Sequence, residues 1–207
     1  EQDLEQFKAE QKTMAEIDHD GIVKSYELRK TDAFWYYVME YVDGYNFGAL
    51  LQRKQHLIEV DCHLIRQSVA LALDYAWNNH GVVHCDIKPE NIMINTDGVI
   101  KLTDLGISHT FEFREGPQDV PEHILGTPAY ISPEQIYGDV ELDCRSDIYS
   151  LGKIMKDIFG RRLERISSKA CRNEASERYA NAEALQKAIR SRHNPAFAIS
   201  ILTILAI

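Results

Sequence analysis

The sequence predicts an α+β fold in which helices dominate and a few short strands lie near the beginning. Residues 23–28 and 34–40 combine β-branched and aromatic side chains on either side of a polar turn, a pattern typical of paired strands. Residues 60–79 and 145–158 carry apolar side chains at helical spacing, and residues 181–190 repeat that pattern near the end. Helices therefore occupy most of the chain after residue 60.

Composition limits the class of protein. The chain has 207 residues and 44% apolar content, enough for one globular domain or a large lobe of one. A net charge of −9 argues against nucleic acid as a partner. The four cysteines are scattered without a Cys-x-x-Cys pair, which argues against a zinc site or a disulfide framework and for a reducing compartment. The chain opens without Met inside a helical pattern and stops in an apolar run, so we expect a fragment.

Residues 84–91, which read His-Cys-Asp-Ile-Lys-Pro-Glu-Asn, are the richest stretch in chemistry. They lie between two apolar runs that we expect to form short strands, residues 81–83 and 92–94. The loop offers a carboxylate (Asp86), an ammonium group (Lys88) and an amide (Asn91) within six residues. Phosphoryl transfer to a hydroxyl group needs such groups to orient the hydroxyl, to neutralise charge and to bind a divalent metal ion.

A second carboxylate, Asp104, follows Asn91 by thirteen residues at the end of the strand-like run 99–103. The two motifs together resemble the catalytic loop and the metal-binding Asp-Phe-Gly motif of protein kinases, with Leu105 in place of Phe. Eight positions match at fixed spacing, which disfavours a surface turn with chance polar residues. The resemblance covers roughly residues 4–190.

The resemblance implies a role for each of these groups. Asp86 would be the catalytic base that orients the substrate hydroxyl, and Lys88 would neutralise the γ-phosphoryl group of ATP. Asn91 and Asp104 would hold Mg²⁺, and Met93 would lie under the adenine ring. A Lys two residues after the Asp is the serine/threonine-kinase form of this loop.

Two earlier segments would complete the nucleotide site. Residues 39–44 resemble the kinase hinge, where backbone groups near Glu40 and Val42 would hydrogen-bond adenine and Met39 would be the gatekeeper. Taken without its context, this segment also fits an ordinary edge strand and turn. Glu10 lies where the family's helix C glutamate pairs with a lysine, and the alternative for Glu10 is one more solvated helix charge.

Later segments resemble the structural parts of the kinase large lobe. Residues 126–135 resemble the substrate-docking segment, with Thr127 expected to contact the catalytic-loop Asp and Lys. Glu134 would pair with Arg178. Asp147, at the start of a helix similar to kinase helix F, would accept hydrogen bonds from the catalytic-loop backbone, since a buried carboxylate needs such partners.

The chain also departs from the family pattern. Cys85 replaces the Arg that usually precedes the catalytic Asp, so we expect weak or absent control by activation-loop phosphorylation. The region between Gly160 and Arg178 is too short for the usual helix G. The 207 residues hold no Gly-x-Gly-x-x-Gly loop and no strand-three Val-Ala-x-Lys, so this fragment is expected to be nearly inactive.

We therefore expect a protein-kinase-like fold over residues 1–193, with 1–40 the end of the N-lobe (helix C and about two strands) and 41–193 a mostly helical C-lobe. The expected function is a bacterial-type, ATP- and Mg²⁺-dependent protein serine/threonine kinase in signalling, with a cytoplasmic domain and Ser/Thr hydroxyls of proteins as substrate. A pseudokinase scaffold stays open because of Cys85 and the missing lysine. A small-molecule phosphotransferase is disfavoured by Lys88 and by the docking segment.

The last segment, residues 195–207, is almost wholly apolar. Thirteen residues are too few to cross a bilayer, which needs about twenty, but they fit the first half of a transmembrane helix. Arg190 and Arg192 fit a cytoplasmic flank, which predicts anchoring to the inner membrane. The alternative is a buried C-terminal helix or strand of the domain.

Overall fold

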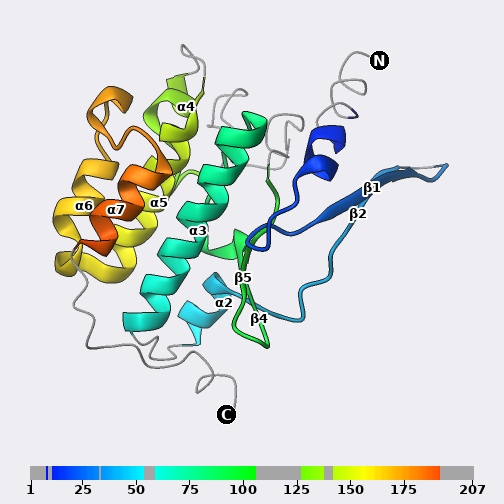
Figure 1. Ribbon diagram of the computed structural model, residues 1–207, viewed down its shortest axis with the longest axis horizontal. Coiled ribbons are helices and arrows are strands. Elements are labelled where there is room, and N and C mark those ends of the chain that lie inside the picture. Colours follow the sequence, from blue (N-terminus) through cyan, green and yellow to red (C-terminus); the bar gives the residue numbers. More distant parts are fainter. Residues whose placement is uncertain are drawn as a thin grey trace.

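The computed structural model describes residues 8, 11–32, 34–53, 59–105, 127–137 and 142–191. Figure 1 shows a helical part, which holds α3 to α7, and a smaller strand-containing part in which the hairpin β1–β2 projects away from the helices. The strands β4 and β5 lie between the hairpin and α3 (Figure 1). This arrangement confirms the predicted α+β class.

The strands form two antiparallel sheets. β1 (Ser25–Lys30) pairs with β2 (Trp35–Met39), and each of the four strand ends lies within two residues of its predicted boundary. The second sheet has the order β3-β4-β5, with β3 (Gly44–Asn46), β4 (Ile92–Asn95) and β5 (Ile100–Leu102). The strand-like segments 92–94 and 99–103 predicted from the sequence therefore form β4 and β5, which pair with each other across the turn between them.

Backbone hydrogen bonds connect the two sheets at Leu102. The amide of Leu102 donates to the carbonyl of Gly21 at 2.8 Å, and the amide of Val23 donates to the carbonyl of Leu102 at 2.7 Å. These bonds form a parallel bridge at Ile22. The hairpin is thereby fixed beside the end of β5, two residues before Asp104.

The expectation of a strand at residues 81–83 is wrong. The amide of Gly81 donates to the carbonyl of Trp77 at 2.9 Å, and the amide of Val82 donates to that of Ala76 at 3.2 Å. These amides close the end of helix α3, with Gly81 at a φ of 65°, instead of joining a strand ladder. The loop 84–91 is therefore entered from a helix terminus.

Helices make up most of the described chain, and residues 11–16 form a further helical segment before β1. The α-helices are α2 (Phe47–Gln52), α3 (Glu59–His80), α4 (Pro133–Tyr137), α5 (Cys144–Phe159), α6 (Glu164–Ala170) and α7 (Ala182–Arg190). Short 3-10 turns are η1 (Pro89–Asn91), η3 (Gly160–Arg162) and η4 (Ala175–Glu177). Thus α3, α5 and α7 match the three helices predicted from apolar spacing.

The core forms where α5 meets α3, α6 and α7. Ile148, Leu151 and Met155 of α5 are at most 1% exposed, as their spacing predicted. Helices α5 and α6 approach closely at Gly152, where a Cβ atom would come within 2.6 Å of the Cβ of Ala170. In sequence, the short turn η3 and Leu163 separate these two helices. The region between Gly160 and Arg178, expected from the sequence to be too short for the usual helix G, holds one α-helix, α6.

Some predictions fall outside the described residues. Met14 and Ile17 are buried, whereas Glu10, the expected helix C glutamate, lies outside the described part of the chain. Residues 195–207 lie outside it as well. No helix within the described ranges has the length and apolar character needed to cross a bilayer.

A buried ion pair joins α4 to the turn before α7. The Nη1 and Nη2 atoms of Arg178 donate to the two carboxylate oxygens of Glu134 at 2.5 and 2.7 Å, as the sequence predicted. The Arg178 side chain is fully buried and also donates to the carbonyls of Arg145 and Arg172. Burial is the largest single influence and would raise the pKa of Glu134, but the hydrogen bonds from Arg178 and Ser146, with the charge of Arg178, together lower it.

We expect Arg178→Ala to lower the free energy of unfolding by about 3–5 kcal/mol, because it leaves a buried carboxylate without its cation. Urea unfolding would measure this. The control is Arg29→Ala, since Arg29 pairs with Glu27 on the surface, where such pairs contribute little to stability. Equal effects of the two substitutions would contradict the assignment of Glu134–Arg178 as a structural pair.

Candidate active site

The loop 84–91 is held in place by a buried carboxylate. Asp147, 3% exposed at the start of α5, accepts hydrogen bonds from the backbone amides of His84 at 2.8 Å and Cys85 at 2.9 Å. Burial raises the pKa of Asp147, and His84 and the two amides oppose that rise. Gln135 donates from its side chain to the Cys85 carbonyl at 2.7 Å. The predicted role of Asp147 as backbone acceptor is confirmed.

The backbone at Cys85 has an unusual conformation. Its φ of 68° lies in the left-handed region, which costs energy for a residue other than glycine. The hydrogen bonds to Asp147 and Gln135 on either side of Cys85 stabilise this turn. The Cys85 thiol is buried, which raises its pKa, so a neutral side chain occupies the position where the family usually has Arg.

The Asp86 carboxylate receives four hydrogen bonds. Its Oδ1 accepts from the Thr127 amide at 2.9 Å and from the Thr127 hydroxyl at 2.8 Å. Its Oδ2 lies 2.6 Å from Nζ of Lys88 and accepts from Nδ2 of Asn91 at 3.2 Å. Lys88 also donates to the Thr127 hydroxyl at 3.0 Å, so Thr127 contacts both side chains, as the sequence predicted.

These contacts determine the charge state of Asp86. Burial would raise its pKa, but the hydrogen bonds from Lys88 and Thr127 outweigh burial and lower the pKa below the usual value. Asp86 is therefore an ionised acceptor at neutral pH. An ionised carboxylate within reach of a hydroxyl group can orient that hydroxyl and take its proton.

A backbone hydrogen bond joins Asn91 to Thr103, the residue directly before Asp104. The amide of Thr103 donates to the carbonyl of Asn91 at 3.0 Å, and Nε2 of His84 lies 3.0 Å from the carbonyl of Thr103. Asp104 follows directly, exposed and with a left-handed φ of 60°. Nδ2 of Asn91 is already bonded to Asp86, which leaves the amide oxygen of Asn91 for another partner.

This donor set fits Mg²⁺ in the manner of phosphoryl-transfer sites. Within the described ranges, no three His, Cys, Asp or Glu side chains form a cluster that could hold a metal ion. Mg²⁺ is commonly bound by one or two protein oxygens, with water and substrate phosphates completing its octahedron. The Asp104 carboxylate and the Asn91 amide oxygen are groups of the chemical type that Mg²⁺ accepts in such sites.

The expected adenine segment follows β2. The amide of Glu40 donates to the carbonyl of Lys24 at 2.8 Å, which extends the pairing of the hairpin. In the described part of the chain, no hydrogen bond uses the amide or carbonyl of Val42. Met93 on β4 pairs with Asn46 on one side and Lys101 on the other, so it lies in the centre of the second sheet.

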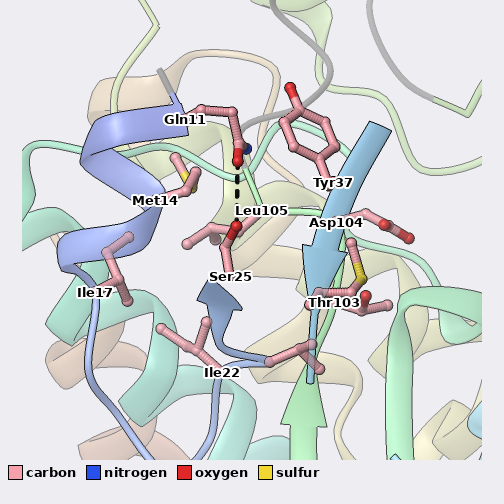
Figure 2. Close-up of a pocket in the computed structure, with 11 residues that line it drawn as sticks. Gln11, Met14, Ile17, Ile22, Ser25, Tyr37, Thr103, Asp104 and Leu105 are labelled. Carbon is pink, nitrogen blue, oxygen red and sulfur yellow. Dashed lines mark hydrogen bonds between the residues drawn. The ribbon is translucent and has the colours of Figure 1, made fainter. Parts of the chain in front are cut away.

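A small cavity of ≈ 30 Å³ lies beside Asp104, between the first helix, the hairpin and the 103–105 segment. Figure 2 shows Met14, Ile17 and Ile22 on one side of it and Tyr37 on the other. Met39 also lines the cavity, so the expected gatekeeper borders both this space and the adenine segment. Ser25 donates to Gln11 across the cavity at 3.2 Å (Figure 2).

The structure thus brings together Asp86, Lys88 and Asn91 by direct contact, with Asp104 beside them. Glu40, Val42 and Met93 lie on neighbouring segments, and Glu10 is outside the described residues. Sequence reasoning missed the bond from Gln135 to Cys85 and an ion pair between Glu40 and Lys101. Neither had a local signal, because the partners are 50 and 61 residues apart.

We expect Thr127→Val to raise the pKa of Asp86, because the substitution removes a hydroxyl that hydrogen-bonds the charged form. Carboxyl ¹³C chemical shifts of Asp86 followed against pH would measure the change. Thr127→Ser keeps the hydroxyl and should leave the pKa close to that of the wild type. An unchanged pKa in Thr127→Val would show that the hydroxyl does not stabilise the carboxylate.

Comparison with known proteins agrees with this geometry. Residues 1–199 match the family model of the protein kinase domain. The chain is 33% identical over 164 residues to the probable serine/threonine-protein kinase PknB of Bifidobacterium longum, covering 75% of this chain and 24% of that protein. It is 32% identical over 160 residues to the serine/threonine-protein kinase PrkC of Bacillus subtilis, covering 77% and 24%. The chain thus spans about a quarter of these relatives.

The fold has a counterpart among solved structures. The crystal structure of the Mycobacterium tuberculosis PknI kinase domain superposes with a TM-score of 0.73 at 22% identity, covering 92% of this chain and 79% of that one. At this identity the likeness shows the fold alone. The match over residues 1–199, together with the catalytic-loop geometry, shows that this chain belongs to the protein kinase family.

Proposed function

We propose that the protein is an ATP-dependent protein serine/threonine kinase of bacterial type that transfers the γ-phosphoryl group of ATP to Ser or Thr hydroxyls in a signalling role. One observation carries the proposal: the Asp86 carboxylate is in contact with Lys88 and accepts hydrogen bonds from Asn91 and Thr127. A general base, a phosphate-neutralising cation and a metal ligand are thereby assembled in one loop. The similarity to bacterial serine/threonine kinases supports the substrate class.

In this proposal Asp86 orients the attacking hydroxyl and accepts its proton. A carboxylate offers about four lone-pair positions, and Thr127, Lys88 and Asn91 use four here. Lys88 turns from Asp86 toward the transferring phosphoryl group, and this movement frees a position on Oδ2 for the substrate hydroxyl. Proton transfer and charge neutralisation are then coupled through one lysine.

The remaining residues would bind the nucleotide. Asn91 and Asp104 hold Mg²⁺, which when bound neutralises phosphate charge and orients the phosphates. Backbone groups of Glu40 and Val42 hydrogen-bond the adenine edge, and Met93 lies under the ring. Glu10 takes the place of the helix C glutamate. Residues 1–40 and 41–193 act as the two lobes, and anchoring through residues 195–207 stays a prediction from the sequence.

The alternative is a scaffold that keeps the fold without catalysis. One feature favours it: Cys85 replaces the usual Arg. The intact contacts of Asp86, Lys88 and Asn91 favour the enzyme, since a scaffold has no need to keep the carboxylate ionised beside a lysine.

The decisive experiment compares the complete gene product with its Asp86→Asn variant in labelled ATP, Mg²⁺ and a generic protein mixture. We expect label on serine or threonine in the wild type and a loss of about 10²–10⁴-fold in the variant, the usual contribution of a general base. Asp97→Asn, in the exposed turn between β4 and β5, is the matched control and should keep full activity. Absence of label in the wild type would favour the scaffold.

The 207-residue chain alone should phosphorylate a basic protein far more slowly than the roughly 1–100 s⁻¹ typical of kinases, because it lacks the loop and lysine that hold ATP phosphates. A steady-state assay at saturating ATP would measure the rate. A rate within the typical range would show that the missing elements are dispensable.

A further inference from the structure

The Glu40 carboxylate is bound from two elements that are distant in sequence. Nζ of Lys101 lies 2.8 Å from Oε1 and 2.9 Å from Oε2, so one ammonium group contacts both oxygens. The amide of Lys24 donates to Oε2 at 3.2 Å, while the amide of Glu40 donates to the carbonyl of Lys24. The side chain and the backbone of Glu40 are therefore both fixed.

This ion pair differs from the other pairs of the hairpin region. The Lys101 and Glu40 side chains are 15% and 26% exposed, whereas those of Arg29 and Glu27 are 55% and 49% exposed. Arg29 and Glu27 are two residues apart, but Glu40 and Lys101 are 61 residues apart. Burial would raise the pKa of Glu40, and the bonds from Lys101 and Lys24 lower it overall, so the carboxylate stays charged.

Lys101 is the middle residue of β5, the strand at one edge of the second sheet. It lies on β5 directly opposite Met93 of β4, and paired residues of antiparallel strands project on the same face. The next residue, Leu102, carries the backbone bonds to the hairpin, and Asp104 follows two positions later. Lys101 thus connects the segment that begins at Glu40 with the strand that leads to Asp104.

We infer that the Glu40–Lys101 ion pair is a positioning contact that fixes the adenine-binding segment, residues 40–42, relative to the metal-binding Asp104. The inference rests on the proposed function, because it assigns the ion pair a task in binding ATP. A nucleotide contacts both places at once, so any freedom between them must be lost on binding. The ion pair removes that freedom before the nucleotide arrives.

Lys101→Met in the complete gene product tests this, with dissociation constants measured by calorimetry for MgATP and for adenosine. We expect MgATP to bind about 5- to 10-fold more weakly, which is within the range of coupling between contacting charged groups. Adenosine contacts only the adenine segment, so its dissociation constant should change less than about 2-fold. This difference between the two ligands is the signature of positioning, which a general loss of stability would not produce.

Two variants complete the test. Lys101→Arg keeps a cation at this position and should restore most of the MgATP affinity. Arg29→Met removes a surface cation from the same hairpin and should bind both ligands like the wild type. Equal weakening of adenosine and MgATP, or unchanged MgATP binding, in Lys101→Met overturns the inference alone. A wild type that binds neither ligand overturns the proposed function and the inference with it.

Discussion

The contact between Asp147 and the backbone of the catalytic loop is the constraint on which the site depends. A carboxylate that is 3% exposed must find hydrogen-bond donors, and the amides of His84 and Cys85 supply them. In return the loop is held in a left-handed turn at Cys85 that it would not adopt without partners. This places the ring of His84 against Thr103 and points Asp86 toward Thr127.

The charges of the site are balanced around Asp86. One carboxylate, one ammonium group and one hydroxyl form a closed set in which each group contacts the other two. Such a set keeps Asp86 ionised in spite of its burial, which a catalytic base requires at neutral pH. It also means that the four acceptor positions of the Asp86 carboxylate are already in use, so the proposed substrate hydroxyl would have to displace one of the existing partners.

A second constraint acts between the sheets. The bonds of Gly21 and Val23 to Leu102 fix the hairpin beside β5, and the Glu40–Lys101 pair adds a contact at the same end of the hairpin, directly after β2. The cavity beside Asp104 lies between these attachments and the first helix. These few backbone hydrogen bonds and the ion pair therefore determine the position of the hairpin relative to Asp104.

The sequence by itself determined the family, the helices α3, α5 and α7, and the groups of the catalytic loop, because these are properties of neighbouring residues. Asp86, Lys88 and Asn91 lie within six positions, and apolar spacing along one segment is enough to define a buried helix face. The strand expected at residues 81–83 failed because the amides of Gly81 and Val82 are used by the end of α3. The local sequence pattern does not show whether these amides will bond to carbonyls of the preceding helix or to a neighbouring strand.

Only the tertiary structure decided two long-range polar contacts that neither the local pattern nor the resemblance predicted. Gln135 bonds to Cys85 and Lys101 bonds to Glu40 across 50 and 61 residues of sequence. In the sequence, nothing around Gln135 or Lys101 distinguishes it from a side chain that is exposed to solvent. Their partners are set by the packing of α3, α5 and the two sheets, which brings distant segments together as apolar faces are buried. Electrostatic positioning of the site is therefore a consequence of the whole fold, whereas its chemical groups are a consequence of one loop.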